Sequence, residues 1–199
     1  MKAILAATDP KLAWYIARSS GLVAWVVVTA SILWGLTLST RLIRRRGVPA
    51  WLLDLHRFLG GLSVVFSAVH LLALVADNYV HFGLRELFVP YATNWRPGSV
   101  AWGIVALYVL VAVEVTSLMM KRMPRKVWRA IHASSFFLFI AATAHGLTSG
   151  ADRTNLVVQW ATLSGLSLVV FLTLYKFYVP KPGGKKTRDA RAAVSRAAG

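Results

Sequence analysis

Long apolar runs separated by short polar segments form the main pattern along this chain. Five runs each hold about 20 residues, at roughly 21–40, 51–76, 99–119, 128–148 and 155–175. A helix of about 20 residues crosses a hydrocarbon layer of about 30 Å. The pattern therefore predicts an all-α integral membrane protein, built as a bundle of about five transmembrane helices.

The segments outside these runs predict smaller features. Residues 1–20 are mixed, with an apolar and aromatic patch, and predict an interfacial N-terminal segment. The loop 77–98 is rich in aromatic residues and predicts a short surface helix over 83–89. We therefore divide the chain into the interfacial segment 1–20, a transmembrane bundle at 21–176 and a basic tail at 177–199.

Basic residues gather at alternate ends of the apolar runs. Of the 23 Lys and Arg residues, 16 lie in three clusters, at 41–50, 121–130 and 176–199. Cytoplasmic segments carry such an excess, so we expect the N-terminus outside and the C-terminus inside. The expected location is the inner or plasma membrane, as a multi-pass protein in contact with lipid. The clustering argues against nucleic acid as a partner, despite a formal net charge of +16.

The chain contains no cysteine. This excludes disulfides, covalently attached c-type heme, and cysteine-ligated iron–sulfur or zinc sites. Histidine-ligated heme, zinc and copper stay open.

Four of the five histidines lie inside the second and fourth apolar runs, where an ionisable residue is a functional-site candidate. His56 and His70 are 14 residues apart, and His132 and His145 are 13 apart; these spacings correspond to about 21 Å and 20 Å along a helix. His56 and His132 lie near the basic ends of their runs, whereas His70 and His145 each precede an aspartate by seven residues. Since both runs cross in the same direction, His56 should pair with His132, and His70 with His145.

Two such pairs favour two b-type hemes, because two imidazoles on one iron leave no open position and suit electron transfer. One alternative is a set of histidines that only hydrogen-bond to neighbouring helices, but four histidines at matched depths argue against it. A zinc or copper site is another. The separation of about 20 Å within each run argues against one compact metal site.

The 13-residue spacing creates a geometric conflict. Fourteen residues at about 100° each fall about 40° short of four turns, so His56 and His70 share a helix face. Thirteen residues fall about 140° short, so His132 and His145 do not share one. We therefore predict either a local distortion of the fourth run or an offset of the two hemes around it.

The double histidine spacing, with the stretches LDLHRFLG, HLLAL and DNYVHFG, resembles the ferric reductase-like transmembrane domain and its stand-alone actinobacterial members. That superfamily includes the NADPH oxidases and eukaryotic ferric reductases, and the resemblance covers about residues 12–176. It implies transmembrane electron transfer through an inner heme on His56 and His132 and an outer heme on His70 and His145.

The chain departs from the oxidases after its last apolar run. Only about 23 residues follow, with no Gly-rich nucleotide fingerprint. We therefore expect an oxidoreductase component, ferric reductase-like, without its own flavin or NADPH domain. Its partner would be a membrane quinol, a separate flavoprotein donor or an extracytoplasmic acceptor.

Arginines near the histidines are candidates to bind heme propionates, because guanidinium groups pair well with carboxylates. Arg57 and Arg129 are the candidates on the inner side, and Arg18 is the candidate on the outer side. The alternative for each is a side chain that extends to the membrane surface.

Two further ionisable residues keep several interpretations. His81, in the outer loop, could bind a propionate, contact the electron acceptor or a metal substrate, or be an ordinary interfacial residue. Glu114 is the carboxylate well inside an apolar run, which suggests a proton path or a quinone site. We expect it instead to pair with Arg57 or Arg129.

The sequence thus predicts a di-heme b-type cytochrome that passes electrons from an inner-side or quinol donor to an outer-side acceptor. One alternative is a quinol-linked cytochrome b anchor subunit of a larger oxidoreductase, which makes quinone a further candidate ligand. Another is a non-heme transporter or structural membrane partner, although the sequence shows no clear inverted repeat.

Overall fold

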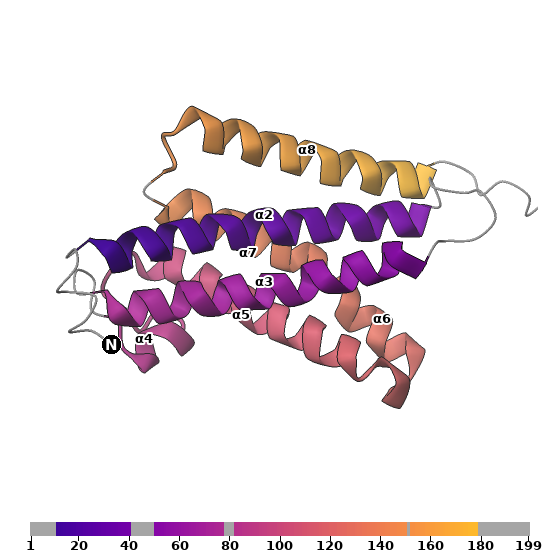
Figure 1. The fold of residues 1–199 in the computed structure, drawn as a ribbon, viewed down its shortest axis with the longest axis horizontal. Helices are drawn as coiled ribbons and strands as arrows, with labels where there is room; N and C mark the ends of the chain where they lie inside the picture. The colour runs from indigo at the N-terminus through magenta and orange to yellow at the C-terminus, as the bar shows by residue number, and fades with distance from the viewer. Residues whose placement is uncertain (1–10, 41–49, 78–81, 151, 179–199) are drawn as a thin grey trace, which may run out of the picture.

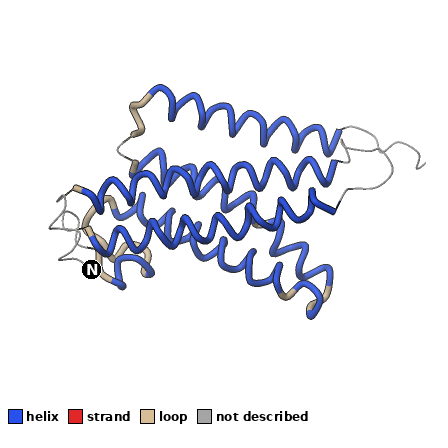
Figure 2. Tube along the Cα trace, viewed as in Figure 1, coloured by secondary structure: helices blue, strands red, loops and turns tan. Residues whose placement is uncertain are grey.

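The computed structural model describes residues 11–40, 50–77, 82–150 and 152–178. Every regular element in these ranges is helical (Figures 1 and 2). Five helical segments within them are long and apolar enough to cross a membrane. The chain is therefore an all-α, multi-pass membrane protein, and this prediction is confirmed.

The helices follow one another with short connections. They are α2 (Leu12–Thr40), α3 (Ala50–Ala76), α4 (Leu84–Phe88), α5 (Pro97–Leu118), the 3₁₀ helix η1 (Met120–Arg122), α6 (Arg125–Ala133), α7 (Ser135–Ser149) and α8 (Leu156–Tyr178). Helices α2, α3, α5 and α8 each form one candidate span, and α6 together with α7 forms the fifth. The short helix predicted over 83–89 is present as α4, and its position at the membrane surface stays a prediction.

The spans pack as two antiparallel helix pairs. Helix α2 packs along α3, and α5 packs along α7, while α8 lies against α2 at the edge of the bundle (Figure 1). Aliphatic and aromatic side chains fill the core between the pairs. They are Val28, Ile32, Leu36, Ala106, Leu110, Leu138, Phe139, Ala141 and Val169.

The two ends of the bundle differ. Helix α4 lies at one end and α6 at the other (Figure 1). At the α4 end, the buried side chains of Phe82 and Leu87 pack on Val100 and Ile104 of α5 and form an apolar cap. Helix α6 contributes no buried residue at the opposite end. We refer to these as the α4 end and the α6 end.

The first span starts earlier than the hydropathy pattern predicts. Helix α2 begins at Leu12 rather than near Gly21, so the described part of 1–20 continues the span instead of forming a separate element. No proline or glycine interrupts residues 12–20, and nothing there breaks a helix. An interfacial position for this part stays a prediction.

The fourth span is interrupted between α6 and α7, and the predicted local distortion is confirmed. Ser134 has ψ −8°, and its N–H donates to the carbonyl of Ile131 at 3.0 Å, a 3₁₀-type bond. Its Oγ donates to the same carbonyl at 2.5 Å, a side-chain bond that bends helices. A tighter turn rotates the chain further per residue. This is the direction needed to bring His145 back toward the face that carries His132.

Some predictions lie outside the described residues. His81 is one of them, and so is the predicted tail 177–199 apart from Phe177 and Tyr178, which end α8. The division of the chain into three parts and the sidedness of the membrane stay predictions.

Candidate functional site

The structure brings the four span histidines together in two pairs. The ring centroids of His56 and His132 lie 5.9 Å apart, with planes at 77°. Those of His70 and His145 lie 6.3 Å apart, with planes at 79°. An imidazole nitrogen binds a metal at about 2 Å, so two rings on opposite sides of one metal have centres about 6 Å apart. Both pairs have the spacing of two imidazoles that share one metal ion.

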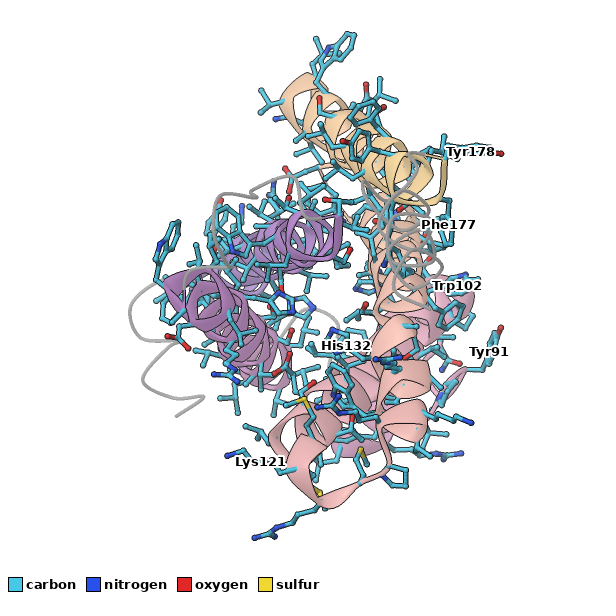
Figure 3. All side chains as sticks on the ribbon, turned by 90° about the vertical axis from the view of Figure 1, so that its right-hand side faces the viewer. Tyr91, Trp102, Lys121, His132, Phe177 and Tyr178 are labelled. Atoms are coloured by element: carbon cyan, nitrogen blue, oxygen red, sulfur yellow. The ribbon has the colours of Figure 1, made fainter. Side chains whose placement is uncertain are left out.

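Figure 3 shows where one of these rings lies relative to the bundle. His132 points toward the centre of the ring of helices, whereas Trp102 and Phe177 lie on its outside. Exposed apolar side chains such as these suit contact with lipid. Across the described residues, no three or more His, Asp or Glu side chains converge on one point. The histidine arrangement is therefore one of separate, internal pairs.

Three of the rings donate a hydrogen bond from Nδ1 to a backbone carbonyl of a neighbouring helix. The bonds run from His56 to Ser31 (3.1 Å), from His70 to Ala17 (2.8 Å) and from His145 to Ser99 (2.8 Å). A carbonyl only accepts, so Nδ1 carries the proton and Nε2 keeps its lone pair. Metal-binding histidines are held in this way in most sites.

A glycine stands four residues after each of these carbonyls and faces the same ring. The three contacts are Gly35 with His56, Gly21 with His70 and Gly103 with His145. A Cβ added to Gly21 would lie 2.9 Å from Nδ1 of His70, and one added to Gly103 would lie 2.7 Å from Nδ1 of His145. The missing side chain therefore lets the helix backbone approach the imidazole.

The glycines repeat with the histidine spacing. Gly21 and Gly35 are 14 residues apart on α2, as His56 and His70 are on α3. Because the two helices are antiparallel, each glycine meets its histidine about 21 Å from the other contact. Sequence reasoning missed these glycines, and the equal spacing on two successive apolar runs was the signal that could have found them.

His132 is held differently from the other three. Fourteen residues after Gly103, α5 carries Ser117 in place of a glycine, and Oγ of Ser117 lies 3.4 Å from Nδ1 of His132. Trp128, one turn earlier on α6, stacks on the His132 ring with centroids 5.1 Å apart and planes at 24°. The sequence-based prediction gave neither residue a role.

An apolar cavity surrounds His70 and His145 at the α4 end. Side chains of α2, α3, α5 and α7 line it, together with Phe82 and Leu87 of the apolar cap. Polar side chains, among them Arg18 and Asp152, also border it. The cavity provides apolar walls around the ring pair.

Arg18 is bound to Asp152 through a two-bond fork. Its Nε lies 2.9 Å from Oδ2 of Asp152, and its Nη2 contacts Oδ1. The fork joins α2 to the segment between α7 and α8. Arg18 was predicted as a propionate partner, and sequence reasoning did not identify Asp152 beside it.

The predicted ion pair of Glu114 with Arg57 is wrong. Nη1 of Arg57 lies 3.3 Å from Asp54, three residues earlier on the same helix, where side chains are neighbours by helix geometry. Glu114 instead faces Gly60, and a Cβ there would lie 2.5 Å from Oε1. The small residue lets α5 approach α3 at this point.

The alternative pairing of Glu114 with Arg129 is also absent. Among the described residues, no ion pair joins Glu114 to Arg129. Both Arg57 and Arg129 are exposed, and Arg129 lies three residues before His132. Their role toward a bound group stays a prediction.

A model of the family described as "ferric reductase like transmembrane component" matches residues 20–143. The match spans more than half of the chain. The chain belongs to the ferric reductase-like transmembrane family. The matched region holds His56, His70 and His132 and ends two residues before His145. Comparison with curated proteins and with solved structures found no significant match.

Family membership indicates a membrane electron-transfer component. Domains of this family generally bind heme and usually work with a redox partner. The residues of this structure fit such a group, because both ring pairs have the spacing of two imidazoles on one iron. The Nδ1 bonds leave Nε2 as the metal-binding atom, and the glycines leave space at the rings.

Proposed function

We propose that the chain is a di-heme b-type cytochrome that carries single electrons across the membrane. One heme would lie between His56 and His132, and the other between His70 and His145. The observation that carries the proposal is the paired geometry, with ring centroids 5.9 Å and 6.3 Å apart. Such spacing occurs twice, at depths separated by about 21 Å along α3.

The protein side chains would bind the groups and fix their orientation. Heme iron between two imidazoles supplies one-electron redox chemistry and keeps no position open for oxygen. Nε2 of each histidine would bind iron. The carbonyls of Ser31, Ala17 and Ser99 would hold the ring orientation through Nδ1.

The basic residues give the proposed direction of transfer. Lys121, Arg122, Arg125, Lys126 and Arg129 gather at the α6 end, which the positive-inside rule assigns to the cytoplasm. His56 and His132 would then form the inner site, reduced by an inner-side or quinol donor. His70 and His145 would form the outer site and deliver electrons to an outer-side acceptor. A separate redox protein would supply one of these partners.

Arginine side chains would neutralise the carboxylates of the hemes. Arg18 borders the cavity around His70 and His145, and Asp152 orients its guanidinium group. Arg57 and Arg129 would serve the site at the α6 end from exposed positions. A guanidinium near an anionic carboxylate is the favourable pairing in each case.

Glu114 favours a second candidate function, that of a quinol-linked subunit of a larger oxidoreductase. Its carboxylate lies inside a span, close to Gly60 and thus one turn from His56 along α3. A quinol gives up protons with its electrons, and an acid within the membrane can accept one. Slower reduction of Glu114→Gln by a quinol analogue, with dithionite reduction unchanged, would favour this function.

The first experiment is a spectrum of the detergent-purified chain, oxidised and dithionite-reduced, with heme quantified per chain. Two b-type hemes per chain with six-coordinate, low-spin iron are expected. The nearly perpendicular ring planes also predict strongly anisotropic low-spin electron paramagnetic resonance signals. A colourless protein, even after expression with heme supplied, would contradict the proposal.

A further inference from the structure

Trp128 contacts His132, the span histidine whose Nδ1 has no backbone hydrogen-bond partner among the described residues. Its ring stacks on His132 at 5.1 Å and 24°. The contact from Ser117 Oγ to Nδ1 of His132 is 3.4 Å long, near the limit for a hydrogen bond. The stacked indole face therefore restrains rotation of this imidazole together with the serine contact.

The indole N–H of Trp128 has a further property. Its Nε1 is buried. Among the buried side-chain nitrogen and oxygen atoms of the described residues, this one lacks a hydrogen-bond partner. Two other indoles of the bundle are satisfied. Trp25 donates to Thr143 Oγ1 at 2.9 Å, and Trp34 donates to the carbonyl of Leu52 at 2.9 Å. Buried donors are nearly always paired, so Trp128 calls for an acceptor that these side chains do not supply.

The surroundings indicate the chemistry of that acceptor. Trp128 lies between Arg125 and Arg129 on α6, and both arginines are exposed. No ion pair involves either arginine among the described residues. Both guanidinium groups would attract an anionic oxygen to this part of α6, and an N–H donates well to such an oxygen. A carboxylate of a planar group bound at the adjacent histidine pair meets these conditions.

We infer that Trp128 donates its indole N–H to a carboxylate of the heme held by His56 and His132. Trp128 is then a positioning residue with two contacts, one to the imidazole face and one to the edge of the bound group. The inference rests on the proposed function. It adds a specific hydrogen bond that neither the family match nor the histidine geometry requires.

The test separates the N–H from the aromatic face. Trp128→Phe keeps an aromatic ring and removes the donor, whereas Trp128→Leu removes both. Trp102→Phe is the matched control, because Trp102 packs on Phe137 and is exposed on the outside of the bundle (Figure 3). The full-length, heme-loaded protein is mixed with excess apomyoglobin, and the two phases of heme loss are timed. His132→Ala and His145→Ala assign each phase to its site.

Trp128→Phe is expected to speed heme loss from the His56–His132 site by about tenfold, since a hydrogen bond to a charged group is removed. Heme loss from the His70–His145 site should not change, which shows that the variant is folded. Trp102→Phe should match the wild type. Resonance Raman spectra should show altered propionate bands in Trp128→Phe alone.

Three results would overturn the inference alone. Trp128→Phe could behave as the wild type while Trp128→Leu loses heme, which would leave Trp128 a stacking role only. Both variants could retain heme normally, in which case the N–H binds nothing at this site. Trp128→Phe could lower the quinone content of lipid extracts with heme unchanged, which would make the acceptor a quinone carbonyl. A wild-type chain without heme would overturn the proposed function as well.

Discussion

The two histidine pairs are built on similar helices but held by different contacts. At His70 and His145, both rings donate to backbone carbonyls at 2.8 Å. At His56 and His132, one ring has a carbonyl at 3.1 Å and the other has a serine hydroxyl at 3.4 Å. The first site is covered by an apolar cap, whereas α6 beside the second site buries no residue.

The difference shows that one packing arrangement supports three of the rings and is altered at the fourth. A carbonyl followed four residues later by a glycine supports three of the four rings. At the fourth ring Ser117 stands at the glycine position, so the side chain replaces the backbone as the contact. The pair at the α4 end is therefore the more restrained site. The pair at the α6 end depends on side chains that substitution can alter.

The largest effect is expected from removing a histidine. His70→Ala and His145→Ala should each lower the heme content from two to one per chain and remove the same spectral component. His56→Ala and His132→Ala should remove the other component. Heme quantification and electron paramagnetic resonance of the four variants check the pairing. Loss of the same component from His70→Ala and His132→Ala would contradict it.

A glycine substitution tests the restraint at the α4 end. Gly103→Ala would add a Cβ 2.7 Å from Nδ1 of His145, and we expect a loss of about 1–3 kcal/mol in stability from overpacking. Thermal unfolding of the variant and its heme content at the His70–His145 site measure this effect. Gly61→Ala is the matched control, because no atom lies within 4 Å of the Cβ it would add.

The control substitution should be neutral or stabilising, since glycine lowers helix stability relative to alanine by roughly 0.5–1 kcal/mol. Equal losses in Gly103→Ala and Gly61→Ala would show that the close approach of α5 to His145 carries no cost. That outcome would remove the proposed role of the glycines.

The ion pairs should contribute less to stability than the glycine substitution removes. A double-mutant cycle on Arg18→Gln and Asp152→Asn should yield a coupling energy of about 1 kcal/mol, because the fork has two bonds and is part-buried. The exposed Arg57–Asp54 pair should yield about 0.3 kcal/mol or less. Chemical unfolding in detergent measures both. A larger coupling for Arg57–Asp54 would contradict the ranking of the two ends.

The smallest change in stability is expected from Ser117→Gly, which would give the fourth ring the arrangement of the other three. Glycine weakens the helix by about 1 kcal/mol or less, while His132 Nδ1 gains access to the carbonyl of Val113, a bond that contributes about 1 kcal/mol. The net change in stability should stay within about 0.5 kcal/mol. Heme loss from the His56–His132 site should become slower by a few-fold. Faster heme loss would show that the serine hydroxyl is the better support.

Sequence reasoning succeeded where a feature depends on position along a helix. Run lengths gave the five spans, and residue counts from charged ends predicted that His56 faces His132 and His70 faces His145. The conflict between 13 and 14 residues predicted either a distortion of the fourth span or an offset of the two hemes, and the structure has a distortion at Ser134. These features depend only on the rise and turn of an α-helix.

Reasoning failed where a side chain had more than one possible neighbour. Glu114 was assigned to arginines at a similar depth, but Arg57 pairs with Asp54 on its own helix and Glu114 faces Gly60. Asp152 lies 134 residues from Arg18 in the chain, and no spacing rule links them. Helix α2 also extends to Leu12, through residues whose mixed polarity predicted an interfacial segment separate from the span.

The sequence by itself determined the number of spans and which histidines lie at matching positions along them, because these follow from hydrophobicity and helical periodicity. Periodicity also required either a distortion of the fourth span or an offset of the two bound groups, and the structure shows a distortion at Ser134. Only the tertiary structure decided which atoms hold each ring. The rotation of a helix about its axis and the choice of neighbour arise from packing between segments that are distant in the chain. Such packing decided three sets of contacts: the glycine and carbonyl contacts of the rings, the Arg18–Asp152 fork and the stacking of Trp128 on His132.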